Sequence, residues 1–515
     1  MGKEFATDYL VVGAGAMGMA FTDVLLSESD ATITIVDSKA NPGGHWNDAY
    51  PFVRLHQPSS FYGVNSTPLG GNRKDLHGGN AGLYELASGT ELVTYFDQLM
   101  NRRFLPSGRV RYLPVSEFLG DGQIRNLVSG ATTNVEAKKT VDATYMNVTV
   151  PSVTPPKYDV AEDVWCVPLN DLPELVDLPE EYVVVGGGKT AIDACLWLLD
   201  NGVDDDCIRW VVPRDQWMLD RAHIQPGEEF IDLAMLRQAQ TMELVADSES
   251  LDAMFDALVE SGVLLQLDES VRPSMYRCCT VTTKELEQLR RLKRVIRMGR
   301  VLRIEEDRIL MEKGEVPTSP RIVHVDCTAD GLARRPIRKV FEDGLITLQT
   351  VRTCKQVFSA AFIGHVEIAY SGDEVKNDQA VWFGDEEFTS FKDLLERTVK
   401  KLKGGLKMAI RAAPDFNPML HSHAFFVYGC AGCMQAPVNP GGWLYCATCA
   451  GNGSWHCALS NWAWDPDGKV RAIGLVYPNI LEGGKPKLEP YQMGKTSKST
   501  DNKLYSVRCW MMLNE

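Results

Sequence analysis

Two glycine-rich turns of the same kind constrain this chain more than any other feature. The first occupies residues 13–18 (GAGAMG) and the second residues 186–191 (GGGKTA), and a short apolar run precedes each, at residues 9–12 and 182–185. A turn of the form G-x-G-x-x-G or G-x-G-x-x-A between a strand and a helix is the fingerprint of a Rossmann βαβ unit. The sequence therefore predicts an α/β chain with two Rossmann-like dinucleotide-binding domains, each doubly wound and three-layered.

In the first unit each glycine has a separate physical role. Gly13 allows the tight turn, Gly15 lets backbone N–H groups approach a pyrophosphate, and Gly18 lets the helix pack closely on the sheet. The helix that follows directs the positive end of its dipole toward the phosphates. A second strand, residues 33–36, ends at Asp37, whose carboxylate is placed to accept hydrogen bonds from ribose hydroxyls.

The second unit lacks this acidic residue. Its second strand, residues 208–212, is followed by Pro213 and Arg214. An arginine at this point can bind a 2′-phosphate, so the site favours NADPH over NADH, although an ordinary surface salt bridge is the alternative role for Arg214. Two dinucleotides in one chain imply that a hydride passes from a nicotinamide to a second, resident cofactor.

The loop after the first unit is also informative. Gly43, Gly44, His45 and Trp46 follow the acidic strand, and Gln57 comes shortly afterwards. Two glycines and a tryptophan here suit a loop that crosses the face of a bulky cofactor. A buried core position is an equal alternative for the tryptophan.

Composition excludes several classes of protein. With 53 Lys+Arg against 68 Asp+Glu, the net charge is −15, which argues against a nucleic-acid binder because phosphate contacts need a basic surface. No apolar run approaches the roughly 18 residues of a membrane span. The N-terminus enters a strand pattern too early for a signal peptide, and 13 cysteines in a long chain do not resemble a secreted disulfide scaffold. We expect a reduced, cytoplasmic enzyme.

These residues resemble flavoproteins with two dinucleotide-binding domains, and most closely the flavin-containing monooxygenase family. The resemblance covers about residues 7–420 and rests on the two glycine turns, on Gly43–Trp46 at the family's G-G-x-W loop, and on residues 210–217. It implies FAD at the first site and NADPH at the second. The residues that it assigns to the cofactors are Gly13, Gly15, Gly18, Asp37, Gly44, His45, Trp46 and Gln57 for FAD, and Gly186, Gly188, Lys189, Thr190 and Arg214 for NADPH.

The family's chemistry gives the expected function. The resemblance implies an NADPH-using monooxygenase that oxidises a small organic metabolite with molecular oxygen through a C4a-(hydro)peroxyflavin. His45, Trp46 and His365 are the candidate flavin-proximal residues, with a hydrogen-bonded structural role as the alternative for His365. A flavin reductase or dehydrogenase without oxygen insertion, a disulfide oxidoreductase-like enzyme, and a flavin-binding redox sensor or scaffold are the other hypotheses.

The chain departs from the family's pattern at two places. Residues 158–175 contain neither the glycine nor the histidine of the F-x-G-x-x-x-H fingerprint, and the A-T-G turn reads Ala143-Thr144-Tyr145, with residues 326–331 as its expected counterpart in the second half of the FAD domain. A disulfide reductase is disfavoured because no C-x-x-C occurs between residues 180 and 320. The vicinal pair Cys278-Cys279 is more typical of small buried hydrophobes.

We expect four segments along the chain. A strand at 321–326 is expected to return the chain to the first sheet, and the arginine-rich stretch 286–300 to be a helix with a solvated basic face. The predicted segments are residues 1–164 and 319–424 for the FAD domain, 165–318 for the inserted NADPH domain, and 425–515 for an irregular Cys- and Trp-rich C-terminal extension that is partly disordered.

The C-terminal extension contains two C-x-x-C pairs, Cys430/Cys433 and Cys446/Cys449. Four thiolates are enough for a tetrahedral structural zinc. A flavin-coupled dithiol, or no chemistry at all, are the alternatives.

Overall fold

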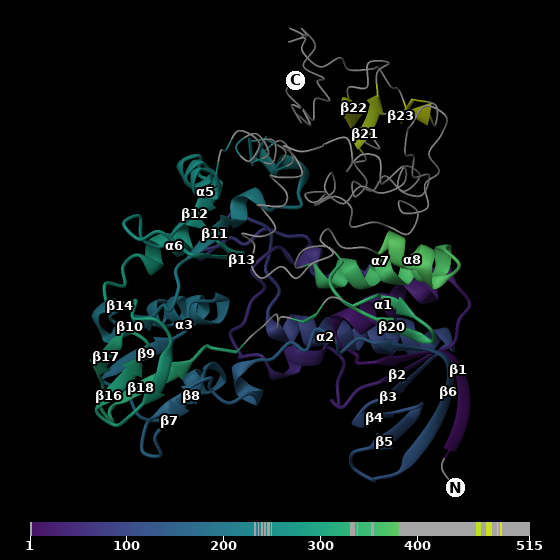
Figure 1. Cartoon of the computed structure of the whole chain (residues 1–515), viewed down its shortest axis with the longest axis horizontal. Coiled ribbons are helices and arrows are strands. Elements are labelled where there is room, and N and C mark those ends of the chain that lie inside the picture. The colour runs from purple at the N-terminus through teal and green to yellow at the C-terminus, as the bar shows by residue number, and fades with distance from the viewer. Residues whose placement is uncertain are drawn as a thin grey trace.

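The structure is a computed structural model in which two α/β lobes lie side by side (Figure 1). It describes residues 3–230, 250–329, 335–336, 338–351 and 355–380, several positions between 233 and 248, and four short C-terminal strands. These strands are β21 (Ser460–Trp464), β22 (Val470–Leu475), β23 (Leu481–Glu482) and β24 (Lys485–Pro486).

The first lobe is built on an eight-stranded sheet in which β20, β6, β1, β2 and β3 are consecutive parallel neighbours. The core strands are short and apolar, and all four residues of β2 are buried, as expected for a parallel sheet covered on both faces. The strands are β1 (Lys3–Val12), β2 (Ile33–Val36), β3 (Val110–Leu113), β4 (Ser116–Gly120), β5 (Gln123–Asn126), β6 (Thr132–Asp142), β19 (Phe341–Glu342) and β20 (Leu345–Thr347).

Helices α1 (Ala16–Glu28) and α7 (Gln356–Ala369) form a packed pair beside this sheet (Figure 1). Gly364 makes the close approach possible, because a Cβ added there would lie 3.2 Å from the Cβ of Val24. Two further helices belong to this lobe, α2 (Gly89–Leu99) and α8 (Asp373–Gln379).

The second lobe repeats the plan with a five-stranded parallel sheet in the order β14-β10-β9-β18-β8. Helix α3 (Lys189–Asp200) follows β9 and packs on α6 (Thr283–Leu289). The strands are β8 (Cys166–Pro168), β9 (Glu181–Val185), β10 (Ile208–Val211), β14 (Val295–Ile296) and β18 (Ile322–Asp326).

The expectation that residues 321–326 complete the first sheet was wrong. This strand is β18, which pairs on one side with β9 and on the other with β8 in the second sheet. All five of its residues are buried, as a strand between two parallel neighbours requires. In the first sheet β20 takes the expected place beside β6.

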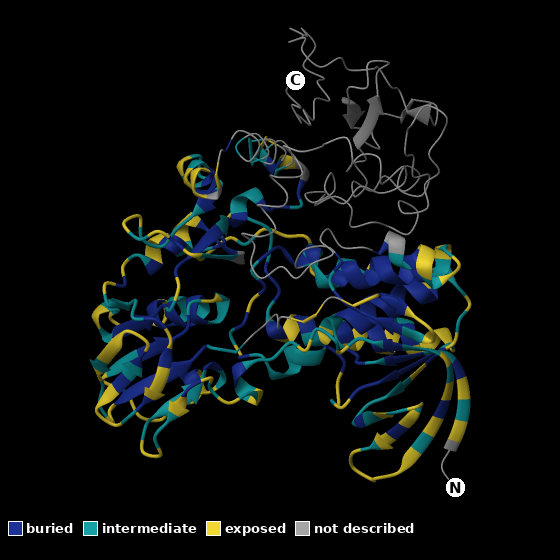
Figure 2. Cartoon of the chain, viewed as in Figure 1, coloured by how far each residue is buried: buried dark blue, intermediate teal, exposed yellow. Residues whose placement is uncertain are grey.

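Two smaller sheets complete the second lobe. The arginine-rich stretch is not one helix, because α6 ends at Leu289 and β14 follows. Figure 2 shows the centres of both parallel sheets buried, whereas most residues of the β4–β5 hairpin are half-buried or exposed. The remaining elements are β7 (Asp159–Val160), β15 (Val301–Ile304), β16 (Arg308–Met311) and β17 (Gly314–Pro317) in one sheet, and β11 (Gln216–Asp220), β12 (Leu264–Leu265) and β13 (Met275–Val281) in the other, beside α5 (Leu251–Glu260).

Within the described residues, we find no helix with both the length and the apolar character of a membrane span.

Candidate dinucleotide-binding sites

The first glycine turn needs glycine at both of its ends. Gly13 has φ +106°, which L side chains rarely adopt, and its N–H donates to the Val36 carbonyl at 2.8 Å. A Cβ at Gly18 would lie only 2.0 Å from the Gly13 carbonyl oxygen. The turn and the helix can therefore meet only without a side chain at residue 18.

A second pair of glycines lies directly against this turn. The N–H of Gly43 donates to the Ala14 carbonyl at 2.8 Å, and a Cβ at Gly44 would lie 3.0 Å from the Cα of Gly15. Gly15 is also the N-terminal cap of α1 and has no side-chain capping bond. Backbone N–H groups at a helix N-terminus beside bare glycines make a surface that a pyrophosphate can approach closely.

Asp37 lies at the edge of the same turn. Its Oδ2 accepts a hydrogen bond from the Ala14 N–H at 2.6 Å, and its Oδ1 accepts one from the Lys39 N–H at 2.8 Å. Asp37 as a whole residue is 9% exposed. The structure thus fixes the carboxylate beside the first glycine turn, as the sequence predicts, and its contact with a ribose stays a prediction.

The segment after the turn begins with a short 3₁₀ helix at Gly44–Asp48. The rings of His45 and Trp46 lie 4.8 Å apart, and burial lowers the pKa of His45 to about 4, so its imidazole is neutral at pH 7. Trp46 packs against the apolar cores of both lobes. The core alternative for Trp46 is therefore supported, while its contact with a flavin stays a prediction.

Gln57 and its neighbour His56 lie between the two lobes. Gln57 is buried, and its side chain accepts a hydrogen bond from Lys355 Nζ at 2.5 Å and donates one to Thr280 Oγ1 at 3.5 Å. Burial, with a smaller contribution from the cations Lys189, Arg221 and Lys355, lowers the pKa of His56 to about 3. Its Nδ1 is buried, with no hydrogen-bond partner in the described part of the chain. Our sequence reasoning did not select His56, and only its position beside Gln57 could have indicated it.

The second glycine turn is constructed like the first. Gly186 has φ +142°, its N–H donates to the Val211 carbonyl at 3.0 Å, and a Cβ there would lie 2.7 Å from the Cys327 carbonyl oxygen. The Trp210 indole donates to the Gly186 carbonyl at 2.7 Å, and Gln216 Nε2 donates to the Gly187 carbonyl at 2.5 Å. These bonds fix the turn from the side of the sheet.

The residues that would meet a phosphate lie at the start of α3. Gly188 is its exposed N-terminal cap, and a Cβ there would meet no atom within 4 Å. Lys189 and Thr190, both half-buried, are the first two residues of the helix, and Lys189 forms an ion pair with Asp193. Arg214 is exposed on the loop after β10, close to the turn, since its carbonyl lies 3.3 Å from the Cβ position of Gly187.

An Asp-x-Thr turn closes each glycine turn, a repeat that our sequence reasoning missed. In the first lobe the Ala143 N–H donates to the Val12 carbonyl at 2.9 Å, and Asp142 accepts from both the N–H and the hydroxyl of Thr144. The second lobe repeats these three contacts. The Cys327 N–H donates to the Val185 carbonyl, and Asp326 accepts from both the N–H and the hydroxyl of Thr328. The signal was present as D-A-T and D-C-T at the end of apolar strands. Residues 326–329 therefore serve the second turn, and our assignment of them to the first domain was wrong, while residues 330 and 331 lie outside the described residues.

His365 does not lie at the first turn. It is buried in α7, and its Nδ1 lies 2.8 Å from Glu28 Oε2. Glu28 is the last residue of α1, and the first residue of α1 follows the glycine turn. About 18 Å of helix therefore separates Glu28 from the turn. The hydrogen-bonded structural role is therefore the one that the contacts support.

The structure describes Cys279, one of the two vicinal cysteines, but not the predicted zinc ligands. Cys279 is buried, and burial raises its pKa to about 12, so it is a protonated thiol at pH 7. Cys430, Cys433, Cys446 and Cys449, the predicted zinc ligands, lie outside the described residues.

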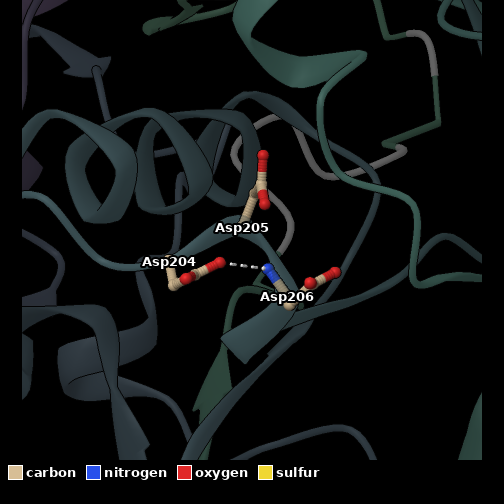
Figure 3. A group of neighbouring side chains, drawn as sticks. All are labelled: Asp204, Asp205 and Asp206. Carbon is tan, nitrogen blue, oxygen red and sulfur yellow. Dashed lines mark hydrogen bonds between the residues drawn. The ribbon is translucent and has the colours of Figure 1, made fainter.

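One cluster of possible metal ligands occurs in the described part of the chain, at Asp204, Asp205 and Asp206 (Figure 3). Asp204 caps the short turn by accepting a hydrogen bond from the Asp206 N–H at 3.0 Å, and Asp205 pairs with Arg291 at 3.4 Å. These contacts account for the cluster without an ion.

Several solved structures are similar to this chain. A doubly substituted flavin monooxygenase from Stenotrophomonas maltophilia is 13% identical, with 71% of this chain and 99% of that chain covered and a TM-score of 0.41. A cyclohexanone-bound cyclohexanone monooxygenase is 13% identical, with 79% and 99% covered and a TM-score of 0.46. A bacillithiol disulfide reductase from Staphylococcus aureus is 10% identical, with 71% and 98% covered and a TM-score of 0.40.

Comparison by sequence gives a firmer relationship. No protein-family model matches the chain. The uncharacterized protein Rv2000 of Mycobacterium tuberculosis is 52% identical over 376 residues, which cover 73% of this chain and 70% of that protein, and the uncharacterized protein Mb2023 of Mycobacterium bovis matches to the same extent. The chain belongs to the same protein family as Rv2000 of Mycobacterium tuberculosis.

Proposed function

We propose that this protein is an FAD- and NADPH-dependent oxidoreductase of the monooxygenase type that acts on a small organic metabolite. The observation that carries the proposal is the repeated construction of the two sites. Each has a glycine turn at a helix N-terminus, closed by an Asp-x-Thr turn on the neighbouring strand. One chain with two such turns suits a hydride donor and a resident hydride acceptor.

The first turn fits FAD. Gly13, Gly15 and Gly18 leave backbone N–H groups accessible to a pyrophosphate, and Gly44 adds a second bare surface against Gly15. Asp37, already held beside the turn, would accept hydrogen bonds from ribose hydroxyls. FAD would supply the capacity to take a hydride from NADPH and, once reduced, to react with oxygen.

The residues that would line the isoalloxazine are His45, Trp46 and Gln57. The neutral imidazole of His45 and the ring of Trp46 would exclude water from one side of the ring system. Gln57 would present its amide, which Lys355 and Thr280 hold in one orientation.

The second turn fits NADPH. Gly186 and Gly188 would let the pyrophosphate approach the N-terminus of α3, where Lys189 and Thr190 add a charge and a hydroxyl. Arg214 would bind the 2′-phosphate, because Val212 and not an acidic residue directly follows β10, and the nearby Asp215 is buried and paired with Arg297 at 3.0 Å. This preference distinguishes NADPH from NADH by charge.

A disulfide oxidoreductase fits the described residues poorly. Such an enzyme attacks through a thiolate, whereas burial raises the pKa of Cys279 to about 12 and that of Cys166 to about 11. Both thiols therefore lack the charge that the reaction needs.

The experiment is to identify the bound cofactor and then follow oxygen. We expect heat to release FAD from the purified protein, and we expect NADPH oxidation to rise when a substrate is present, with one oxygen atom from O₂ in the product. FAD with NADPH oxidation that yields only hydrogen peroxide, whatever organic compound is supplied, would favour a reductase. Protein that binds no flavin would exclude the proposal.

A further inference from the structure

One segment of the chain, residues 43–57, connects the two glycine turns. Its second residue, Gly44, lies against Gly15 of the first turn. It then crosses to the second lobe, where Phe52 stacks on Trp197 of α3 with ring centroids 4.7 Å apart. We call it the connecting segment.

A hydrogen bond and an ion pair join this segment to the second turn through Asp193 of α3. The hydroxyl of Tyr50 donates to Asp193 Oδ2 at 2.5 Å. The same carboxylate forms an ion pair with the ammonium of Lys189, one helical turn earlier, and Lys189 Nζ also reaches the Arg54 carbonyl at 3.4 Å. Asp193 is thus shared between a residue of the connecting segment and a residue at the mouth of the second site.

This group is partly shielded from water. The side chains of Asp193 and Lys189 are 15% and 25% exposed, and Tyr50 is 7% exposed. Burial and the neighbouring Asp193 hold the pKa of Tyr50 well above its usual range, so its hydroxyl is a donor throughout the working pH range. Shielded charge pairs lose less of their interaction to solvent than exposed pairs do.

The position of Lys189 sets up a competition. It is the first residue of α3, where a phosphate group would bind to the backbone N–H groups. In the structure, however, its ammonium turns back toward Asp193. A phosphate at the second turn must therefore compete with the Asp193 carboxylate for this ammonium.

We propose that Asp193 is a positioning residue which, with Tyr50, couples occupancy of the second dinucleotide site to the first. When a phosphate draws Lys189 away, the carboxylate is left with Tyr50 as its partner, and the connecting segment, which contacts the first turn, adjusts. This inference rests on the proposed function, because it requires a dinucleotide at each turn. Thermodynamic linkage makes the coupling reciprocal, so each cofactor changes the affinity for the other by the same factor.

The test uses the full chain with FAD bound and NADP⁺ as the probe. Calorimetry measures the NADP⁺ dissociation constant, the flavin visible spectrum reports the effect at the first site, and FAD affinity is compared with and without NADP⁺. We expect NADP⁺ to perturb the flavin spectrum and to change FAD affinity in the wild-type protein. We expect Tyr50→Phe to bind NADP⁺ about as tightly as wild type but to lose most of both effects.

The Asp193→Asn variant separates positioning from simple structural support. Removing the competing charge should tighten NADP⁺ binding by about threefold while abolishing the coupling. A residue that only supports the helix would instead weaken NADP⁺ binding when replaced. Tyr182→Phe, at a half-buried position of β9 in the same lobe, is the matched control and should behave like wild type.

The outcomes are distinct. Undiminished coupling in Tyr50→Phe, or weaker NADP⁺ binding in Asp193→Asn, would overturn the inference. Wild-type protein that binds FAD and NADP⁺ independently would also overturn it and leave the proposed function standing. Wild-type protein that binds neither cofactor would overturn both.

Discussion

At the scale of single residues, the positions where a side chain is sterically impossible carry the most information. A Cβ at Gly18 would lie 2.0 Å from a backbone oxygen that cannot move without opening the turn. We expect Gly18→Ala to lower the free energy of unfolding by about 2 kcal/mol or more and to abolish FAD binding. Chemical denaturation and FAD titration check this. Gly71→Ala, which meets only the exposed side chain of Arg73, should change neither quantity.

Arg214 carries a prediction about cofactor choice. Replacing it with alanine removes the cation proposed for the 2′-phosphate, so the KM for NADPH should rise about tenfold while the KM for NADH stays unchanged. Steady-state assays with both nucleotides check this. An equal rise in both KM values would mean that Arg214 supports the fold of the turn and does not recognise the phosphate.

At the scale of elements, the pairing of α1 with α7 determines how the first turn is supported. Gly364 lies in this interface, and a Cβ added to it would lie 3.2 Å from the Cβ of Val24. We expect Gly364→Leu to separate the helices, to cost about 1–3 kcal/mol of stability, and to weaken FAD binding because α1 carries the turn at its N-terminus. Thermal unfolding with and without FAD measures both effects. Ala369→Leu, at an exposed position on the same helix, should be neutral.

The elements also mark the limit of what the sequence could predict. Both βαβ units could be predicted from the glycine turns, because the need for glycine at these positions comes from local steric contacts that the sequence spacing reveals. The sheet membership of residues 321–326 was wrong, because an apolar strand pattern specifies burial and not which neighbour supplies it. His56 and Asp193 escaped prediction for a related reason, since their roles come from contacts between segments far apart in the chain.

At the scale of the whole molecule, three histidines whose pKa values are lowered in the fold make stability depend on pH. Burial lowers the pKa of His45 and His324 to about 4 and that of His56 to about 3, below the value of about 6.5 in an unfolded chain. Between these values the unfolded state binds more protons, so stability is fully present above about pH 6.5 and falls as the pH drops toward 4. The slope is at most about 1.4 kcal/mol per histidine per pH unit.

The measurement is the unfolding free energy at pH 7.5 and pH 5. We expect a decrease in the wild-type protein and a smaller decrease in His324→Gln. In the wild-type protein, Nδ1 of His324 donates to the Trp165 carbonyl, and Nε2 can accept from the Thr318 hydroxyl only while the ring is neutral. Replacing the exposed His77 by asparagine should leave the slope as in wild type. A stability that does not change over this range would contradict the buried, neutral state of these rings.

The central claim is that a hydride passes from a nicotinamide at the second turn to a flavin at the first. The most direct measurement is to mix the purified protein with NADPH, and separately with NADH, without oxygen, and to follow the visible absorption of the oxidised flavin. We expect NADPH to bleach this absorption faster than NADH does, and air to restore it. A bound flavin that neither nucleotide bleaches, or protein without any flavin, would contradict the account.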